Sequence, residues 1–221
     1  MSNTVTLSQL RTRCRERADM ENSEFISDSE LNSYINGSFA ELYDLLVSKF
    51  EDYYTTSTTF TIASGNTESL PSDFYKLRGV DFKIDANNWI TVRKFNFAER
   101  NVLNNSLRRV GNRQLQYRIV GSTLYIEPED NAPGDYKLWY TPIYTPLSSD
   151  SDTVDGVNGW EEYIVIDAAI KMLAKEESST TGLEREKAAM TRRIEAMAQN
   201  RDSGEPESIT DTSFIGDKAL F

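Results

Sequence analysis

Histidine is absent from this sequence, and cysteine occurs once, at Cys14. Without histidine the chain cannot build a Ser-His-Asp or Cys-His nucleophile system, a histidine-ligated zinc site or a histidine proton shuttle. A single cysteine allows neither an intramolecular disulfide nor a thiolate metal cluster. We therefore expect Cys14 to be a small buried residue of a helix, and we expect no cofactor and no metal.

Long apolar runs are also missing. No stretch of about 18 apolar residues could span a membrane, and residues 1–10 lack the apolar core of a signal peptide. The formal net charge is −11, which disfavours a protein that coats nucleic acid, because neutralising phosphates takes an excess of Lys and Arg. An acidic protein can still let DNA pass through a lumen, since like charges prevent sticking.

Two helices are predicted in the first 50 residues. Thr6 followed by Gln9 is typical of a capping box, and this helix should run to about Asp19. Ser27 and Glu30 form the same signature at the start of a second helix. Apolar residues then recur at helical spacing: Leu31, Tyr34, Ile35, Phe39, Leu42, Leu45 and Leu46.

The middle of the chain has the alternation and the turn residues of β structure. Residues 97–107 interrupt it with an amphipathic helix or a long loop. The clearest hairpin turns at Gly121-Ser122, where glycine in the first turn position fits a type II′ loop. The predicted strands are residues 54–62, 80–84, 89–92, 115–120, 123–127 and 136–141.

An acidic Ser/Asp segment, residues 148–157, follows the strands. Asp150, Asp152 and Asp155 have a spacing that resembles a calcium loop. The glycine, however, is at Gly156, one residue after the sixth position that such a loop requires. We interpret this segment as a linker.

Two more helices are predicted after the linker. Asn158 should cap the first, which is apolar over residues 163–173 except for Asp167 and Lys171, spaced to pair at i, i+4. A helix this apolar should be buried, so we expect Ile170→Asp to be severely destabilising. Thr181 should cap the second helix. Most of this helix is charged, and one narrow stripe along it consists of Leu183, Lys187, Met190, Ile194 and Met197.

The order of these elements predicts an α+β fold. N- and C-terminal helices, residues 1–50 and 148–201, form a helical bundle. Residues 51–147 form an inserted, mostly antiparallel β domain. Residues 202–221 form an extended, flexible C-terminal tail.

The tail has an acidic polar spacer and then a small apolar cluster at the end of the chain. Such a composition is typical of a segment that orders on a partner, the spacer giving reach and the anchors giving binding energy. A tail that packs on its own domain, or a frayed end, is the alternative. The expected anchors are Phe214, Ile215, Leu220 and Phe221.

A basic run crosses the middle of this acidic chain, with Glu99 as its only acid. It could face DNA or an acidic partner. The alternative is a solvated face balanced by acids elsewhere in the fold. The basic residues are Arg93, Lys94, Arg100, Arg108, Arg109, Arg113 and Arg118.

Catalysis would have to rest on a carboxylate pair, as in glycoside hydrolysis. Nothing marks one acid as special, so we predict no catalytic residues. Tyr and Trp residues of the strands could stack on sugars, although aromatic residues of a sheet are more often part of a core. A carbohydrate-binding or tail-fibre module that uses the β domain is therefore the alternative function.

Three short motifs resemble the head-to-tail adaptor, or connector, proteins of tailed bacteriophages. Residues 10–13 and 25–38 are similar to the family's first and second helices, the latter with Ser-Asp-Ser-Glu-Leu at 27–31 and Ile-Asn at 35–36. Leu-Pro-Ser-Asp-Phe at 70–74 is similar to the segment that begins the family's β region. The order of elements agrees as well, so the resemblance extends over most of the chain.

The resemblance implies a structural, non-enzymatic protein of the virion neck that is present in the host cytoplasm during assembly. It implies a dodecameric ring of identical subunits through which DNA passes without sequence recognition. The C-terminal tail would bind the portal protein, and the other end of the ring would bind the tail or nozzle protein. Docking would be coupled to the folding of the tail.

Overall fold

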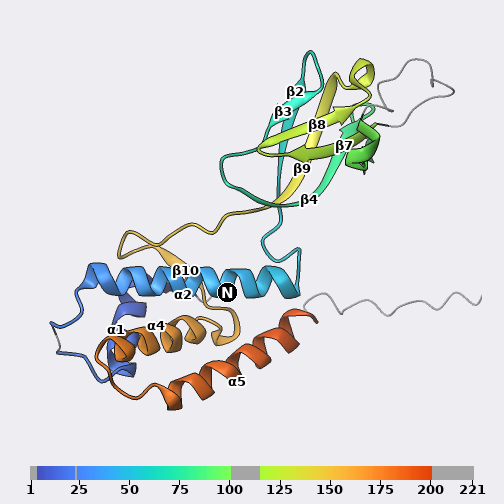
Figure 1. Ribbon diagram of the computed structural model, residues 1–221. Helices are drawn as coiled ribbons and strands as arrows, with labels where there is room; N and C mark the ends of the chain where they lie inside the picture. Colours follow the sequence, from blue (N-terminus) through green and yellow to red (C-terminus); the bar gives the residue numbers. More distant parts are fainter. Residues whose placement is uncertain (1–3, 23, 101–114, 201–221) are drawn as a thin grey trace, which may run out of the picture.

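The computed structural model describes residues 4–22, 24–100 and 115–200, which form a helical part and a β part (Figure 1). The two ends of this described chain build the helical part, and its middle builds the β part. The predicted α+β class, with N- and C-terminal helices packed together, is therefore confirmed. The helical part contains β1 (Thr4–Thr6), α1 (Leu7–Arg17), α2 (Asp28–Lys49), β10 (Thr153–Asp155), α4 (Glu162–Lys175) and α5 (Thr181–Ala198).

Side-chain caps begin the first two helices as predicted. Thr6 Oγ1 accepts a hydrogen bond from the Gln9 backbone at 3.2 Å, and the Gln9 side chain accepts one from the Thr6 backbone at 3.0 Å. Ser27 Oγ accepts from the Glu30 backbone at 3.3 Å. The Glu30 carboxylate does not reach back to its cap, because it binds Tyr34 and Lys175 instead.

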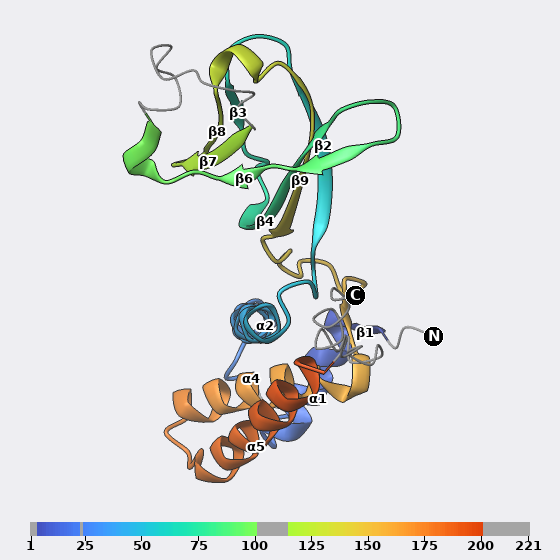
Figure 2. The same cartoon turned by 90° about the vertical axis from the view of Figure 1, so that its right-hand side faces the viewer.

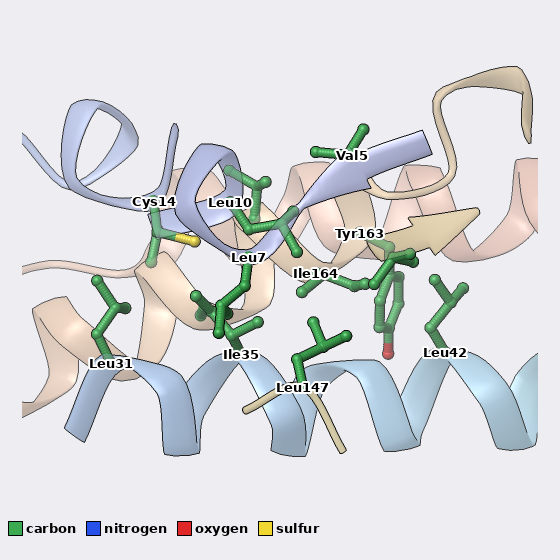
Figure 3. Packing of buried hydrophobic residues seen from close by; sticks show 14 of the residues in the cluster. Val5, Leu7, Leu10, Cys14, Leu31, Ile35, Leu42, Leu147, Tyr163 and Ile164 are labelled. Carbon is green, nitrogen blue, oxygen red and sulfur yellow. The ribbon is translucent and has the colours of Figure 1, made fainter. Parts of the chain in front are cut away.

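Apolar side chains of all four helices meet in one cluster. Leu31, Ile35 and Leu42 of α2 point toward α1 and α4 in Figure 3. Cys14 lies in this cluster, which confirms the expectation for it, and burial raises the pKa of its thiol to about 12. Further members are Leu7, Leu10, Tyr163, Ile164, Met172 and Ile194.

A charged group lies within this helical core. Asp167 of α4 is 3% exposed, and its carboxylate binds Lys171 and Lys187, both at 2.6 Å. Ser38 of α2 also donates to it, at 2.6 Å. Burial opposes the ionisation of Asp167, but these hydrogen bonds outweigh it and hold the pKa of the carboxyl below its usual value. The predicted Asp167–Lys171 pair within α4 is confirmed, and the bonds of Asp167 to Lys187 and Ser38 join α4 to α5 and α2.

The C-terminal helices differ from the prediction in three details. Asn158 does not cap α4; it has a left-handed backbone with φ 55° in the 3₁₀ turn Val157–Gly159. The N-cap of α5 is Thr180, one residue before the predicted position. Ile170 is only half-buried and lies outside the core cluster. Residues 163–169 of α4 are all buried, whereas after Ala169 only one side of the helix is.

Two four-stranded sheets form the β part, ordered β2-β9-β4-β5 and β3-β8-β7-β6. Pairing is antiparallel except between β6 and β7, as the prediction of a mostly antiparallel domain requires. Gly121 has φ 61° in the turn between β7 and β8, where the hairpin was predicted. The strands are β2 (Thr56–Ile62), β3 (Thr67–Ser69), β4 (Phe74–Lys83), β5 (Trp89–Thr91), β6 (Arg93–Lys94), β7 (Gln116–Val120), β8 (Thr123–Glu127) and β9 (Gly134–Pro142).

A second apolar cluster fills the β part. Phe60 and Phe82 pack on the ring of Tyr136, with centroids 5.3 and 5.1 Å away. As predicted for the hairpin, Leu124 and Ile126 share its buried face. The other fully enclosed members are Ile62, Val80, Val92, Ala132, Leu138 and Tyr140.

The joint between the two parts lies next to α2 in Figure 2 and combines aromatic contacts with hydrogen bonds and ion pairs. Tyr43 of α2 stacks on Tyr54 at 4.3 Å and donates its hydroxyl to the carbonyl of Pro142 at 2.6 Å. Burial raises the pKa of Tyr43 to about 12, so the hydroxyl keeps the proton that it donates. Arg78 of β4 pairs with Asp52, 2.8 Å away.

Candidate interaction surfaces

Neither metal-binding clusters nor membrane-spanning helices are present in the described residues. The acidic segment after β9 is used locally instead. Asp152 accepts hydrogen bonds from the backbones of Ser149 and Ser148, which lower the pKa of its carboxyl. Asp150 pairs with Arg11 of α1. The segment also contains β10, which pairs with β1, so it is tied to the helical part along its length.

The basic run begins at the edge of the second sheet. Arg93 and Lys94 form β6, opposite Gln116 and Tyr117 of β7, and both are exposed. Phe95 then turns into the core and fixes this edge.

An exposed aromatic residue follows in the 3₁₀ turn η1 (Phe97–Glu99). Phe97 is 46% exposed, and the guanidinium carbons of Arg100 and Arg118 lie 4.5 and 5.4 Å from the centre of its ring. Arg100 donates to the carbonyl of Phe97 at 3.1 Å, and Arg118 donates to that of Phe95 at 3.0 Å. These bonds hold two cations against one ring, as in a cation–π contact. The basic surface consists of Arg93, Lys94, Phe97, Arg100 and Arg118.

Charge on the basic surface is not neutralised by the part of the chain that the structure describes. None of the ion pairs found among residues 4–22, 24–100 and 115–200 includes one of its four cations. The structure thus brings together four of the seven predicted basic residues. Arg108, Arg109 and Arg113 lie outside the described residues.

The predicted docking tail also lies outside the described residues. Its role therefore stays a prediction from the sequence. The residues concerned are Phe214, Ile215, Leu220 and Phe221.

Sequence reasoning missed a surface of opposite charge at one end of the helical part. The α1–α2 and α4–α5 connections meet there, because Lys175 lies 4.9 Å from the ring of Phe25 and pairs with Glu30 at 2.6 Å. Phe25 is 53% exposed. The sequence did contain a signal for this surface, because acidic residues follow both α1 and α4. These two helices share one core, so the segments that follow them can lie close together. The acidic end consists of Asp19, Glu21, Glu24, Phe25, Glu176 and Glu177, all exposed.

The outer face of the first sheet carries the aromatic residues that could suggest sugar binding. Lys137 lies 4.5 Å from the ring centre of Trp89 and 5.4 Å from that of Trp139. The indole nitrogen of Trp139 donates to Asp81 at 2.7 Å. A sugar stacks on an open ring face, whereas here a lysine covers a face of each ring. The geometry does not favour the carbohydrate-binding alternative.

Comparison with known proteins finds one family match. The family model described as SU10 adaptor protein matches residues 5–210. The match includes the helical part and the β part, and it ends within the predicted tail. No curated protein matches the chain.

Proposed function

Because the chain belongs to the SU10 adaptor protein family, a family of phage head-tail adaptors, we propose that it forms a ring that joins the portal protein to the tail. The observation that carries this proposal is the family match over residues 5–210, which includes both parts of the fold. The family is one of structural adaptors and not of enzymes. In this role the chain acts in the virion neck, and its mechanism is the formation of interfaces.

The C-terminal tail is the segment that we propose binds the portal. Its four apolar anchors follow an acidic spacer that disfavours helix and strand. Burying one such side chain contributes roughly 1.5 to 3 kcal/mol, so four of them can offset the ordering of a short segment. A ring strengthens the binding further. When one tail is bound to the portal, the tails of the neighbouring subunits are held close to their own binding sites, which raises their effective concentration.

DNA passes through the lumen of this ring without sequence recognition. The net charge of −11 supports passage, since an acidic protein has little tendency to hold a polyanion. Tail or nozzle proteins then bind the end of the ring that is away from the portal.

Reconstitution with purified portal protein tests the proposal. Mixing should give complexes of defined mass, and electron microscopy should show a ring on one face of the portal. Deleting residues 203–221 should leave a folded protein that no longer joins the portal, and Phe214→Ala with Phe221→Ala should have most of the same effect. The matched control is Ser208→Ala with Thr210→Ala, which alters the same tail outside its anchors. A truncated chain that still assembles would refute the docking role of the tail.

The basic run gives a second test of the same function. Replacing Arg108 and Arg109 by Ser should leave the fold intact but weaken assembly or DNA retention, and the difference from the unaltered chain should shrink at high salt, which screens these charges. Circular dichroism checks the fold, and the DNA content of assembled particles measures retention. Normal particles at both salt concentrations would show that these two arginines are a solvated surface.

A further inference from the structure

Two exposed surfaces of this chain have the same build and opposite charge. In the basic surface, Arg100 and Arg118 lie over Phe97, and Arg93 and Lys94 are exposed on the preceding strand β6. In the acidic end, Phe25 lies beside Lys175, and five carboxylates are exposed on the α1–α2 and α4–α5 connections. An exposed aromatic residue with a charged rim is the usual anatomy of a protein–protein contact. The chain therefore carries both halves of a complementary pair.

These surfaces do not meet within one chain. The acidic end lies at the end of the helical part where α1 leads into α2, and η1 lies on the β part (Figures 1 and 2). Ion pairs among the described residues join neither surface to the other. Asp19, Glu21, Glu24, Glu176 and Glu177 have no cationic partner within 4 Å in the part of the chain that the structure describes.

We propose that the basic surface of one copy binds the acidic end of a second copy. Such a contact uses two different patches of the same chain, so each copy offers one patch to each neighbour and a ring closes if the rotation allows it. The inference deepens the proposed function and rests on it, since it assigns the residues that hold neighbouring subunits together. Charge complementarity of this kind steers the encounter and fixes the register of the two copies.

A protein partner suits the basic surface better than DNA. Arg100 and Arg118 each use one of their N–H donors on a backbone carbonyl and lie over the ring of Phe97, so an aromatic ring is a built part of this surface. A half-exposed phenyl ring contributes nothing to phosphate binding, whereas burying it against Phe25 and its surroundings contributes to a protein interface. The experiment below distinguishes DNA from a second copy as the partner of the basic surface.

Charge reversal with rescue is the decisive experiment. The basic reversal carries Arg93→Glu, Lys94→Glu and Arg100→Glu, and the acidic reversal carries Glu24→Lys, Glu176→Lys and Glu177→Lys. Each alone should raise the protein concentration needed for the oligomer by about 100-fold, because like charges then face each other. A chain with both reversals should assemble again, since the pairing is restored with inverted signs.

The measurement is the mass of the assembly with portal protein at low and high salt, with circular dichroism as the check of folding. Arg185→Glu with Arg192→Glu on the exposed face of α5 is the matched control, and it should assemble normally. Assembly of both single reversals at normal concentration would overturn this inference while leaving the adaptor function intact. Failure of the double reversal, with loss of DNA retention, would assign the basic surface to DNA. Absence of any ring with the unaltered chain would instead overturn the proposed function.

Discussion

The helical part and the β part are stabilised by different chemistry. The helical core encloses a carboxylate, Asp167, that is held by Lys171 and Lys187 at 2.6 Å. The β core relies mainly on aromatic and aliphatic packing around Tyr136, and its buried carboxylate, Glu127, accepts a hydrogen bond from the Asn66 side chain at 3.1 Å. Helices supply their own backbone hydrogen bonds, so a charged group can specify how α2, α4 and α5 fit together. Sheets are joined by backbone hydrogen bonds between strands, so most of the side chains between the two sheets are apolar and fill the space.

Because the two parts have separate cores, a destabilising substitution in one part should lower the stability of the other only a little. The substitution with the largest expected effect tests this in the helical part. Ile164 is fully buried, and Ile164→Asp places an unpaired carboxylate in the core at a cost of about 5 kcal/mol, on the order of the stability of a domain. Thermal unfolding followed at 222 nm should show loss of the helical transition. Ile170→Asp, on the half-buried side of the same helix, is the control and should cost much less; equal losses would contradict the burial seen here.

Removing the buried carboxylate should have the next largest effect. Asp167→Ala removes the buried partner of Lys171 and Lys187 and leaves both with Glu41 as their remaining carboxylate among the described residues, which should cost about 3 kcal/mol in the free energy of unfolding. Urea unfolding measures the loss. Glu195→Ala, which breaks the partly exposed Lys49–Glu195 pair at 3.1 Å, is the matched control and should cost less than about 1 kcal/mol. Similar values for both variants would show that the buried group adds nothing special.

The same carboxylate should make the helical part sensitive to acid. Its pKa in the folded chain is below the usual value of 3.8, so its contribution to stability is complete above that pH and is lost as the pH falls through the folded pKa. The helical transition should weaken below about pH 4, and Asp167→Asn should remove this part of the pH dependence. An unchanged acid profile in Asp167→Asn would exclude Asp167 as its source.

A glycine of the β part gives a smaller expected loss. A Cβ added at Gly134 would lie 2.5 Å from Cε2 of Phe82, whose ring packs on Tyr136. Gly134→Ala should therefore cost about 2 kcal/mol through overpacking and should lower only the transition of the β part, read from near-UV circular dichroism. Gly79→Ala is the control, because nothing lies within 4 Å of the added carbon. A larger loss at Gly79 would contradict this packing.

The smallest expected effect concerns the joint between the parts. Tyr43→Phe keeps the ring stacked on Tyr54 but removes the hydrogen bond to Pro142, which should cost about 1 kcal/mol. Calorimetry should then show the two transitions further apart. Tyr144→Phe is the control, since the described residues offer its hydroxyl no hydrogen bond. A change of cooperativity in the control but not in Tyr43→Phe would assign the coupling to another contact.

Local signals predicted most of the fold. The caps at Thr6 and Ser27 and the turn at Gly121 depend on residues a few positions apart, and each was found at its predicted place. Four of the five strands of two or three residues, β1, β3, β6 and β10, were missed because they are too short to show a period of two, whereas β5 was predicted at 89–92. Asn158 was misread because the chain turns left-handed there before α4 begins.

By itself, the sequence determined the order of elements, the absence of histidine chemistry and the presence of a basic run in an acidic chain. Only the tertiary structure decided which charges meet. Ser38 reaches Asp167 across 129 positions of the chain, and Arg118 returns to the carbonyl of Phe95 through the pairing of β6 with β7. The basic surface and the acidic end are products of such contacts, because a charge pattern along the chain does not say which side chains face solvent together.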